Sequence, residues 1–179
     1  MNIQTARQWI ANGKRQKALQ WLQTQSDNPD VLLLKALCID EEKNLHWHNA
    51  IEALSQYPSS KDLLLALGQG IAQARKDHDA LLQEQYLLRA IAVASDINNP
   101  IQHIHWISIL ANLHLRQGNP EKALPFLKRS VQLSIAHEHH LVIIAQGLIL
   151  IGLWFSKGDI SRVSALSLSV EDAAVHRHD

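Results

Sequence analysis

Apolar residues recur with the spacing of an amphipathic helix on both sides of a short polar turn near position 118. In the turn Gly118-Asn119-Pro120, Gly can end one helix and Asn can cap the next. Pro suits a first helical position, because its missing N–H is not needed there. The segment 104–133 is therefore predicted to form a helical hairpin. Its apolar positions are Ile107, Leu110, Ala111, His114 and Leu115 before the turn, and Ala123, Leu124, Leu127 and Val131 after it.

A single hairpin of this kind leaves an apolar face uncovered, so repeats of it are expected along the chain. The position equivalent to Ala123 is Val163 forty residues later and Gln83 forty residues earlier. Upstream the spacing falls to 33 and then 32, at Ala50 and Ala18. We predict an all-α chain of ten helices in about five hairpins, forming a single domain over residues 1–179. The hairpins are expected at about 3–26, 30–56, 61–97, 100–137 and 139–176.

The last expected helix contains a segment with a second interpretation. Residues 163–170, VSALSLSV, alternate apolar and polar side chains with period two, as a half-buried strand does. The repeat register favours a helix instead, and an isolated strand would have no partner. We therefore predict a helix here, with a strand as the alternative.

These spacings resemble the tetratricopeptide repeat (TPR). That family places a Trp or Leu, a Leu-Gly pair, a Tyr, a turn Gly and then Ala, an aromatic and Ala at fixed offsets within a helical hairpin. The resemblance implies a right-handed α-α superhelix, a TPR-like solenoid whose first helices line a concave groove. The matching residues of the 100–137 hairpin are Ile107, Leu110, Ala111, His114, Gly118, Ala123, Leu127 and Ser130.

The forty-residue period is longer than the usual TPR period of thirty-four residues. It resembles the longer repeats in the sensor arm of bacterial MalT-like (large LuxR-type) transcription regulators. In those proteins the arm receives a signal or partner, while separate domains bind ATP and DNA. This sequence has no phosphate-binding Gly-Lys-Ser/Thr loop and no helix-turn-helix end. The resemblance therefore implies an arm or a stand-alone relative of one.

The TPR resemblance also implies which side chains line the groove. They form a mostly neutral surface with a polar middle and an apolar C-terminal end, which suits a peptide or a helical partner. The alternative is that many of them are packed or solvated without binding anything. The implied groove residues are Leu32, Lys35, Ile39, Gln69, Gln73, His105, Ser108, Asn112, Arg116, Leu148 and Phe155.

The longest apolar run, LVIIAQGLILIGLWF at 141–155, is too short to span a bilayer and is interpreted as a helix. It is apolar on nearly every side, and such a helix needs cover on more than one face. The last expected helix is poor in large apolar residues. The run therefore predicts self-association, a bound client or further repeats, with a simple buried core helix as the alternative.

Charge and cysteine content narrow the class of partner. Lys and Arg together number 17, as do Asp and Glu, so the net charge is about zero and no basic stripe favours nucleic acid. Cys38 is the one cysteine, which excludes an internal disulfide and fits a reducing compartment. The first residues lack the apolar core of a signal peptide. These features favour a cytoplasmic protein with no membrane segment.

Eleven histidines are many for a chain of this length. Antiparallel hairpins would bring His103 and His105 near His137, His139 and His140, which could form a metal site or a pH-sensitive cluster. Solvated loop histidines are the expected alternative, and we predict no metal and no cofactor. Catalytic triads, paired buried carboxylates and phosphate loops are not evident in the sequence. Cys38 is interpreted as a small core residue.

The sequence therefore predicts a non-catalytic protein–protein interaction module, which binds a peptide or helix in the groove or through the C-terminal apolar hairpin. The alternative function is a ligand- or signal-sensing arm of a bacterial transcription regulator.

Overall fold

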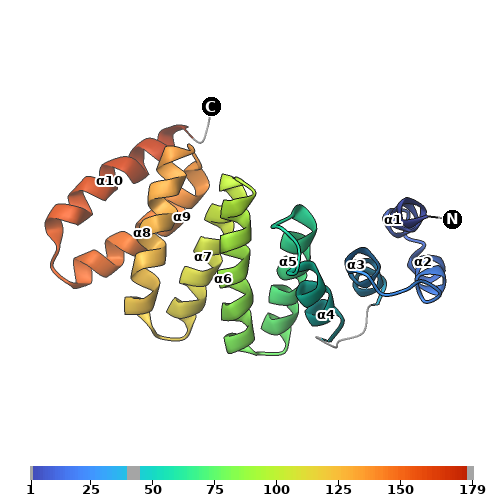
Figure 1. Cartoon of the computed structure of the whole chain (residues 1–179). Helices are drawn as coiled ribbons and strands as arrows, with labels where there is room; N and C mark the ends of the chain where they lie inside the picture. The colour runs from blue at the N-terminus through green and yellow to red at the C-terminus, as the bar shows by residue number, and fades with distance from the viewer. Residues whose placement is uncertain (1, 40–44, 177–179) are drawn as a thin grey trace. The chain divides into compact units, whose positions relative to one another are not determined.

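The computed structural model describes residues 2–39 and 45–176 of the chain, and these residues form ten helices and no strand (Figure 1). The all-α fold and the five hairpins predicted from the sequence are confirmed. The turn inside the hairpin expected at about 30–56 falls largely outside the described residues. The helices are α1 (Ile3–Ala11), α2 (Arg15–Leu22), α3 (Pro29–Cys38), α4 (Leu45–Leu54), α5 (Lys61–Lys76), α6 (Ala80–Asp96), α7 (Pro100–Arg116), α8 (Pro120–Ala136), α9 (His140–Ser156) and α10 (Ile160–Val175).

The described helices group into two compact units. Unit 1 is Met1–Ile97, with helices α1 to α6, and unit 2 is Asn98–Asp179, with helices α7 to α10. The boundary falls at Asn98-Asn99-Pro100, where Pro100 is the first residue of α7. Each unit has its own core, and the single domain expected from the sequence stays a prediction.

Several of the described helices begin at a side-chain cap. The side chains of Asn2, Asn28, Ser60, Asp79 and Asn99 each accept a hydrogen bond from the backbone N–H three residues ahead. The expected cap at the turn before α8 is wrong in one respect. Asn119 occupies the N-cap position, but its side chain makes no capping hydrogen bond. The turn is closed instead by the Asn119 N–H, which donates to the backbone oxygen of His114.

Left-handed backbone conformations mark equivalent turns at forty-residue intervals. His78, Gly118 and Gly158 have φ values of 58°, 73° and 74° in the turns inside hairpins three, four and five. Asn98 and Glu138, again forty residues apart, have φ values of 52° and 55° between hairpins. Gly adopts this conformation without strain, whereas His and Glu do so at a cost. The forty-residue period is therefore a property of the backbone as well as of the side chains.

In unit 1, neighbouring side chains pack closely against Gly70 in α5. A Cβ added there would lie 2.8 Å from Ile51 Cδ1 and 3.0 Å from Tyr86 Cε2, so only glycine fits without a shift of its neighbours. Tyr86 is 2% exposed, and its hydroxyl lies 3.0 Å from Nδ1 of His48. Cys38 packs in the core of the first three helices, which confirms its interpretation as a small core residue.

In unit 2, the segment with period-two alternation is helical. Leu166, Val170 and Ala173 lie on one side of α10 and pack into the core that contains Leu127 and Leu150. The helix interpretation is thus confirmed over the strand alternative, because the side chains that are buried follow helical spacing. His114 is 2% exposed and stacks on Phe126 at 5.6 Å between ring centroids, as expected for a packed position.

Candidate functional site

Helix α9 presents an exposed apolar surface, which we call the α9 stripe: Leu141, Ala145, Leu148, Gly152 and Phe155. The three large side chains are 55%, 56% and 66% exposed. Their spacing of seven residues places them on one side of the helix, two turns apart. Hairpin five, formed by α9 and α10, therefore exposes apolar residues of the 141–155 run, which the sequence predicts to need a partner.

The opposite side of α9 is covered within unit 2. Ile143, Gln146, Gly147 and Leu150 are buried, and a Cβ added to Gly147 would lie only 2.6 Å from Val170 Cγ2 of α10. By contrast, a Cβ added to Gly152 would meet nothing within 4 Å. The apolar surface that is predicted to need a partner is therefore only the side of α9 that faces away from α8 and α10.

Trp154 lies at the edge of this covered side. Its ring is approached by Lys128 of α8 and Arg162 of α10, each 5.9 Å from the ring centroid. Helix α9 itself contains no Asp, Glu, Lys or Arg. Charge therefore lies beside the helix on its neighbours, and the α9 stripe carries none.

The equivalent line on α7, forty residues earlier, is Ile101, His105, Ser108, Asn112 and Leu115. Its ends are apolar, as on α9, but its middle is polar. His105 and Arg116 are exposed and Asn112 is half-buried. Ser108, predicted to line the groove, is 8% exposed. Its hydroxyl donates to the backbone oxygen of Ile104 (2.9 Å) and shares a 2.6 Å hydrogen bond with Ser130 of α8. That hydroxyl joins two helices and is not presented to a partner.

The predicted groove residues of unit 1 separate into two groups. Lys35 forms an ion pair with Asp27, with 2.6 Å between Nζ and Oδ1, so its charge is compensated locally. Leu32 is half-buried. Ile39, Gln69 and Gln73 come together and line one pocket. The structure thus brings together three of the five groove residues expected in this unit.

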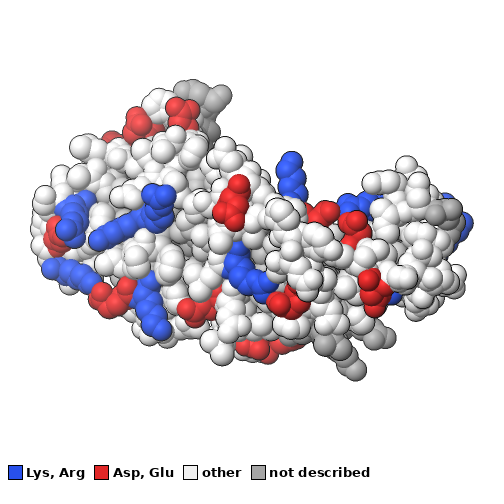
Figure 2. Space-filling view, in the orientation of Figure 1, with Lys and Arg blue, Asp and Glu red and all other residues white. Residues whose placement is uncertain are grey.

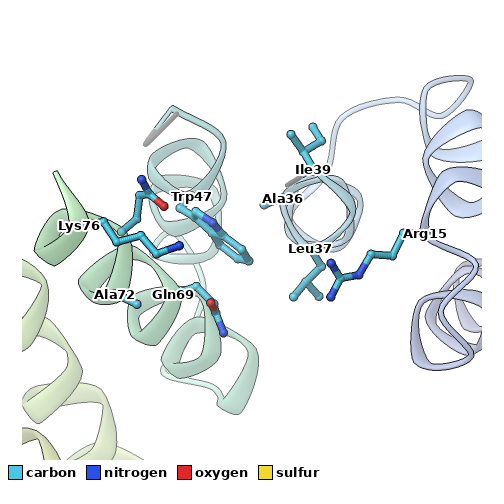
Figure 3. Close-up of a pocket in the computed structure, with 9 residues that line it drawn as sticks. Arg15, Ala36, Leu37, Ile39, Trp47, Gln69, Ala72 and Lys76 are labelled. Carbon is cyan, nitrogen blue, oxygen red and sulfur yellow. The ribbon is translucent and has the colours of Figure 1, made fainter. Parts of the chain in front are cut away.

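This pocket, which we call the α3–α5 pocket, has a volume of about 210 Å³ (Figure 3). Trp47, Gln69 and Lys76 face α3 across it, and the guanidinium of Arg15 lies beside Leu37. Among the described residues, Lys76 has no ion-pair partner. Gln73 donates from Nε2 to Oδ1 of Asp77 at 3.0 Å, which holds its amide at the rim. The lining residues are Arg15, Ala36, Leu37, Ile39, Trp47, Gln69, Ala72, Gln73 and Lys76.

Cys38 adjoins this region without offering a nucleophile. Burial raises the pKa of its thiol, and the nearby charge of Arg15 offsets part of that rise. A thiol with a raised pKa is mostly protonated at neutral pH and is a poor nucleophile.

Of the histidines that the sequence predicts to gather, His105 lies near His139. Burial lowers the pKa of His105, and the nearby His139 lowers it further. His140 and His176 stack with 6.2 Å between ring centroids. Within residues 2–39 and 45–176, no three His, Cys, Asp or Glu side chains are arranged to hold a metal ion.

Sequence reasoning missed an ionic link among the first helices of three hairpins. Nη2 of Arg7 in α1 lies 3.1 Å from Asp30 of α3 and 3.1 Å from Asp62 of α5. The hydrogen bond to Asp62 raises the pKa of Arg7. The available signal was that Asp30 and Asp62 occupy the first turns of successive hairpins, thirty-two residues apart, close to the upstream repeat period.

Lys and Arg side chains mix with Asp and Glu side chains on the face shown in Figure 2. No single-sign field is evident there. None of the described helices is long and apolar enough to cross a membrane.

Comparison with solved structures identifies the fold. Two crystal structures of a Podosopora anserina protein, described as a kinesin light chain with nearly identical TPR-like repeats, superpose with a TM-score of 0.56 at 15% identity. They match 98% of this chain and 94% of that protein. Aspartyl phosphate phosphatase F from Bacillus subtilis superposes with a TM-score of 0.64 at 10% identity, over 98% of this chain and 50% of the phosphatase.

The chain therefore has the fold of TPR-like helical repeat proteins. No protein-family model matches it, and no curated protein sequence matches it. At 10–15% identity the likeness concerns the fold alone.

Proposed function

We propose that this protein is a non-catalytic protein–protein interaction module, which binds the apolar face of a partner helix on the α9 stripe. The observation that carries the proposal is the row of Leu141, Leu148 and Phe155, each more than half exposed on a helix without charge. Contiguous exposed apolar residues on a folded protein mark interaction surfaces. An amphipathic helix lays its apolar face into such a surface.

The polar line on α7 completes this surface in the proposal. His105 and Asn112 occupy the α7 positions that correspond to Ala145 and Gly152 of the stripe, and Arg116 follows at the end of α7. These side chains supply hydrogen-bond donors along one side of a bound helix. The same proposal assigns no cofactor, no nucleic acid and a cytoplasmic setting, supported by the balanced charge and the single buried cysteine.

The test is a selection from a library of random peptides of about eighteen residues on the immobilised protein. We expect enrichment of sequences with apolar residues at positions i, i+3 or i+4, and i+7. Binding of a selected peptide should weaken at least about tenfold in Leu148→Asp, because a charge then faces the apolar side of the peptide. Leu168→Asp is the matched control, since Leu168 of α10 is 67% exposed and lies outside the stripe. Equal binding to both variants, or no enrichment, would overturn the proposal.

A second candidate function is supported by the α3–α5 pocket. Its lining combines the cation of Lys76 with amides and the apolar surfaces of Trp47, Leu37 and Ile39. This set suits a small organic carboxylate with an apolar body, because Lys76 attracts the carboxylate and the Trp47 indole covers the apolar body. A pocket of about 210 Å³ would take a ligand much smaller than a peptide.

In this candidate the chain is a signal-sensing arm, as the resemblance to MalT-like regulators suggests. The forty-residue recurrence of left-handed turns supports that comparison. A panel of carboxylic acids of up to about ten non-hydrogen atoms should contain one that raises the melting temperature. Lys76→Gln should remove the shift, while the exposed control Lys157→Gln should keep it. If no acid shifts the melting curve, the sensing candidate fails and the interaction module is unaffected.

A further inference from the structure

The residues on and beside the α9 stripe form pairs at equal distances from Leu148. Leu141 and Phe155 lie seven residues to either side of it. Ile144 and Gly152 lie four residues away in opposite directions, and Ala145 and Ile151 lie three residues away. Ile144 and Ile151 are half-buried at the edge of the stripe and also pack against the core of unit 2. The two inner pairs therefore combine a large with a small side chain, and the outer pair combines two large ones.

Two copies of this helix have complementary surfaces when they run in opposite directions. In an antiparallel pair of helices with a two-fold axis at Leu148, the residue k positions after Leu148 faces the one k positions before it in the other copy. Ile144 then faces Gly152, Ala145 faces Ile151, and Leu141 faces Phe155. Both isoleucines meet a small residue, as close packing of two helices requires. A parallel pair would instead set Ile144 against Ile144 and leave Gly152 against Gly152.

We propose that the partner of the α9 stripe is a second copy of this chain, with the two α9 helices antiparallel and crossing at Leu148. This inference rests on the proposed function of the stripe and names its occupant. Two further observations support it. Helix α9 has no charged residue, so two copies meet without like-charge repulsion. Gly152 has open space where a Cβ would lie, so it is free to receive a side chain from outside.

One helix pair makes a small interface. Specific interfaces usually bury about 800 Å² on each partner, and one side of a 17-residue helix is a small surface on that scale. The dimer should therefore dissociate in the micromolar range. Association has to be measured over a span of concentrations, from about 1 to about 200 µM.

The first experiment is sedimentation equilibrium of the full chain over that span. The wild type should pass from monomer to dimer and form no larger species, because a two-fold interface is closed. Leu148→Asp should remain monomeric at every concentration, since two carboxylates would meet on the axis. Leu168→Asp should dimerise as the wild type does. A wild type that stays monomeric overturns the inference.

A second pair of variants tests the register. Gly152→Leu places a large side chain opposite Ile144, so it should weaken the dimer at least about tenfold. The monomer should keep its helical circular dichroism, because the added side chain points into open space. Adding Ile144→Ala to Gly152→Leu restores one large residue against one small residue and should recover most of the association. If the double variant is no better than Gly152→Leu alone, the antiparallel register is wrong.

Cross-linking locates the axis directly. In a Cys38→Ala background, Leu148→Cys should form a disulfide-linked dimer under mild oxidation, because the two sulfurs meet at the axis. Leu168→Cys should not, although it is equally exposed. Equal cross-linking of both variants would overturn the inference. If the chain is monomeric but library peptides still bind the stripe, the dimer fails and the proposed function stands.

Discussion

Corresponding lines of residues on α5, α7 and α9 show how one backbone position changes its chemistry between the two units. The line on α5 in unit 1 begins at Lys61 and ends at Lys76. On α7 in unit 2 the same positions are Ile101 and Arg116, and on α9 they are Leu141 and Ser156. At these two positions the number of cations therefore falls from two on α5 to one on α7 and none on α9.

The middle of the line changes in the same direction. Its central residue is Gly68 on α5, Ser108 on α7 and Leu148 on α9. Gly68 has no side chain, Ser108 forms a hydrogen bond between two helices, and Leu148 is 56% exposed. Unit 1 consequently offers a pocket with charged and amide groups, whereas unit 2 offers an uncharged apolar surface. The repeat determines where a side chain is presented, and the residue type determines what it can bind.

The largest expected effect tests whether the two units are as separate as their cores suggest. Leu150→Ala in unit 2 and Leu67→Ala in unit 1 each remove a fully buried side chain, which should cost about 2–5 kcal/mol of unfolding free energy. Hydrogen exchange read by mass spectrometry should show lost protection only in the unit that carries the change. Loss of protection in both units from either variant would establish one cooperative domain and remove the distinction.

The two glycines of α9 provide a matched pair for the two sides of that helix. Gly147→Ala places a methyl group against Val170 and should destabilise unit 2 by about 1–3 kcal/mol. Gly152→Ala adds the same group in open space and should stabilise the helix by about 0.5–1 kcal/mol, because alanine loses less conformational entropy. Urea unfolding of the two variants compares them directly. Equal effects would contradict the assignment of one covered and one open side.

Unit 1 contains the ionic link of Arg7, whereas helix α9 of unit 2 has no Asp, Glu, Lys or Arg that could form one. Arg7→Gln breaks both contacts, to Asp30 and to Asp62, and should cost about 1 kcal/mol or less because all three groups are partly exposed. The loss should shrink at 1 M salt, since salt screens exposed pairs. Urea midpoints at low and high salt measure it. A loss independent of salt would indicate that Arg7 contributes by packing.

Much of the fold could be predicted from the sequence, because helix periodicity and turn residues act over a few neighbouring positions. The hairpin turn at Gly118 and the helix at 160–175 are examples. The α3–α5 pocket could not be predicted in full, since Arg15, Trp47 and Lys76 come from three helices that meet only after folding. Ser108 shows a second limit. It belongs to the expected groove line, but its hydroxyl forms a hydrogen bond with Ser130 of the neighbouring helix and is not presented to a partner.

The smallest expected effect is a difference in acid sensitivity between the units. Burial lowers the pKa of His103 and of His105 below the ordinary 6.5 in unit 2. Folded unit 2 therefore binds these protons less readily than the unfolded chain, and its stability should fall as pH drops below 6.5. In unit 1, the hydrogen bond from Arg89 lowers the pKa of Glu52 below 4.5, so that contribution is lost only at more acidic pH.

Hydrogen exchange at pH 7.5 and pH 5.5, corrected for the intrinsic exchange rate, should show unit 2 losing more protection than unit 1. Replacing both histidines by Gln should remove most of the difference. An equal loss in both units, or a difference that survives the replacement, would contradict this assignment.

The left-handed residues at positions 78, 118 and 158 have a consequence for how such a chain can change in length. Each marks the same point of a hairpin, with the backbone in the same conformation. A duplication or deletion between two of them joins backbone ends of the same conformation. The positions that face the core in one hairpin therefore still face it in the next. An insertion of a few residues inside one of these helices would rotate the rest of that helix and turn its apolar side away from its neighbours. The part of the chain that holds hairpins three to five can therefore change in steps of forty residues.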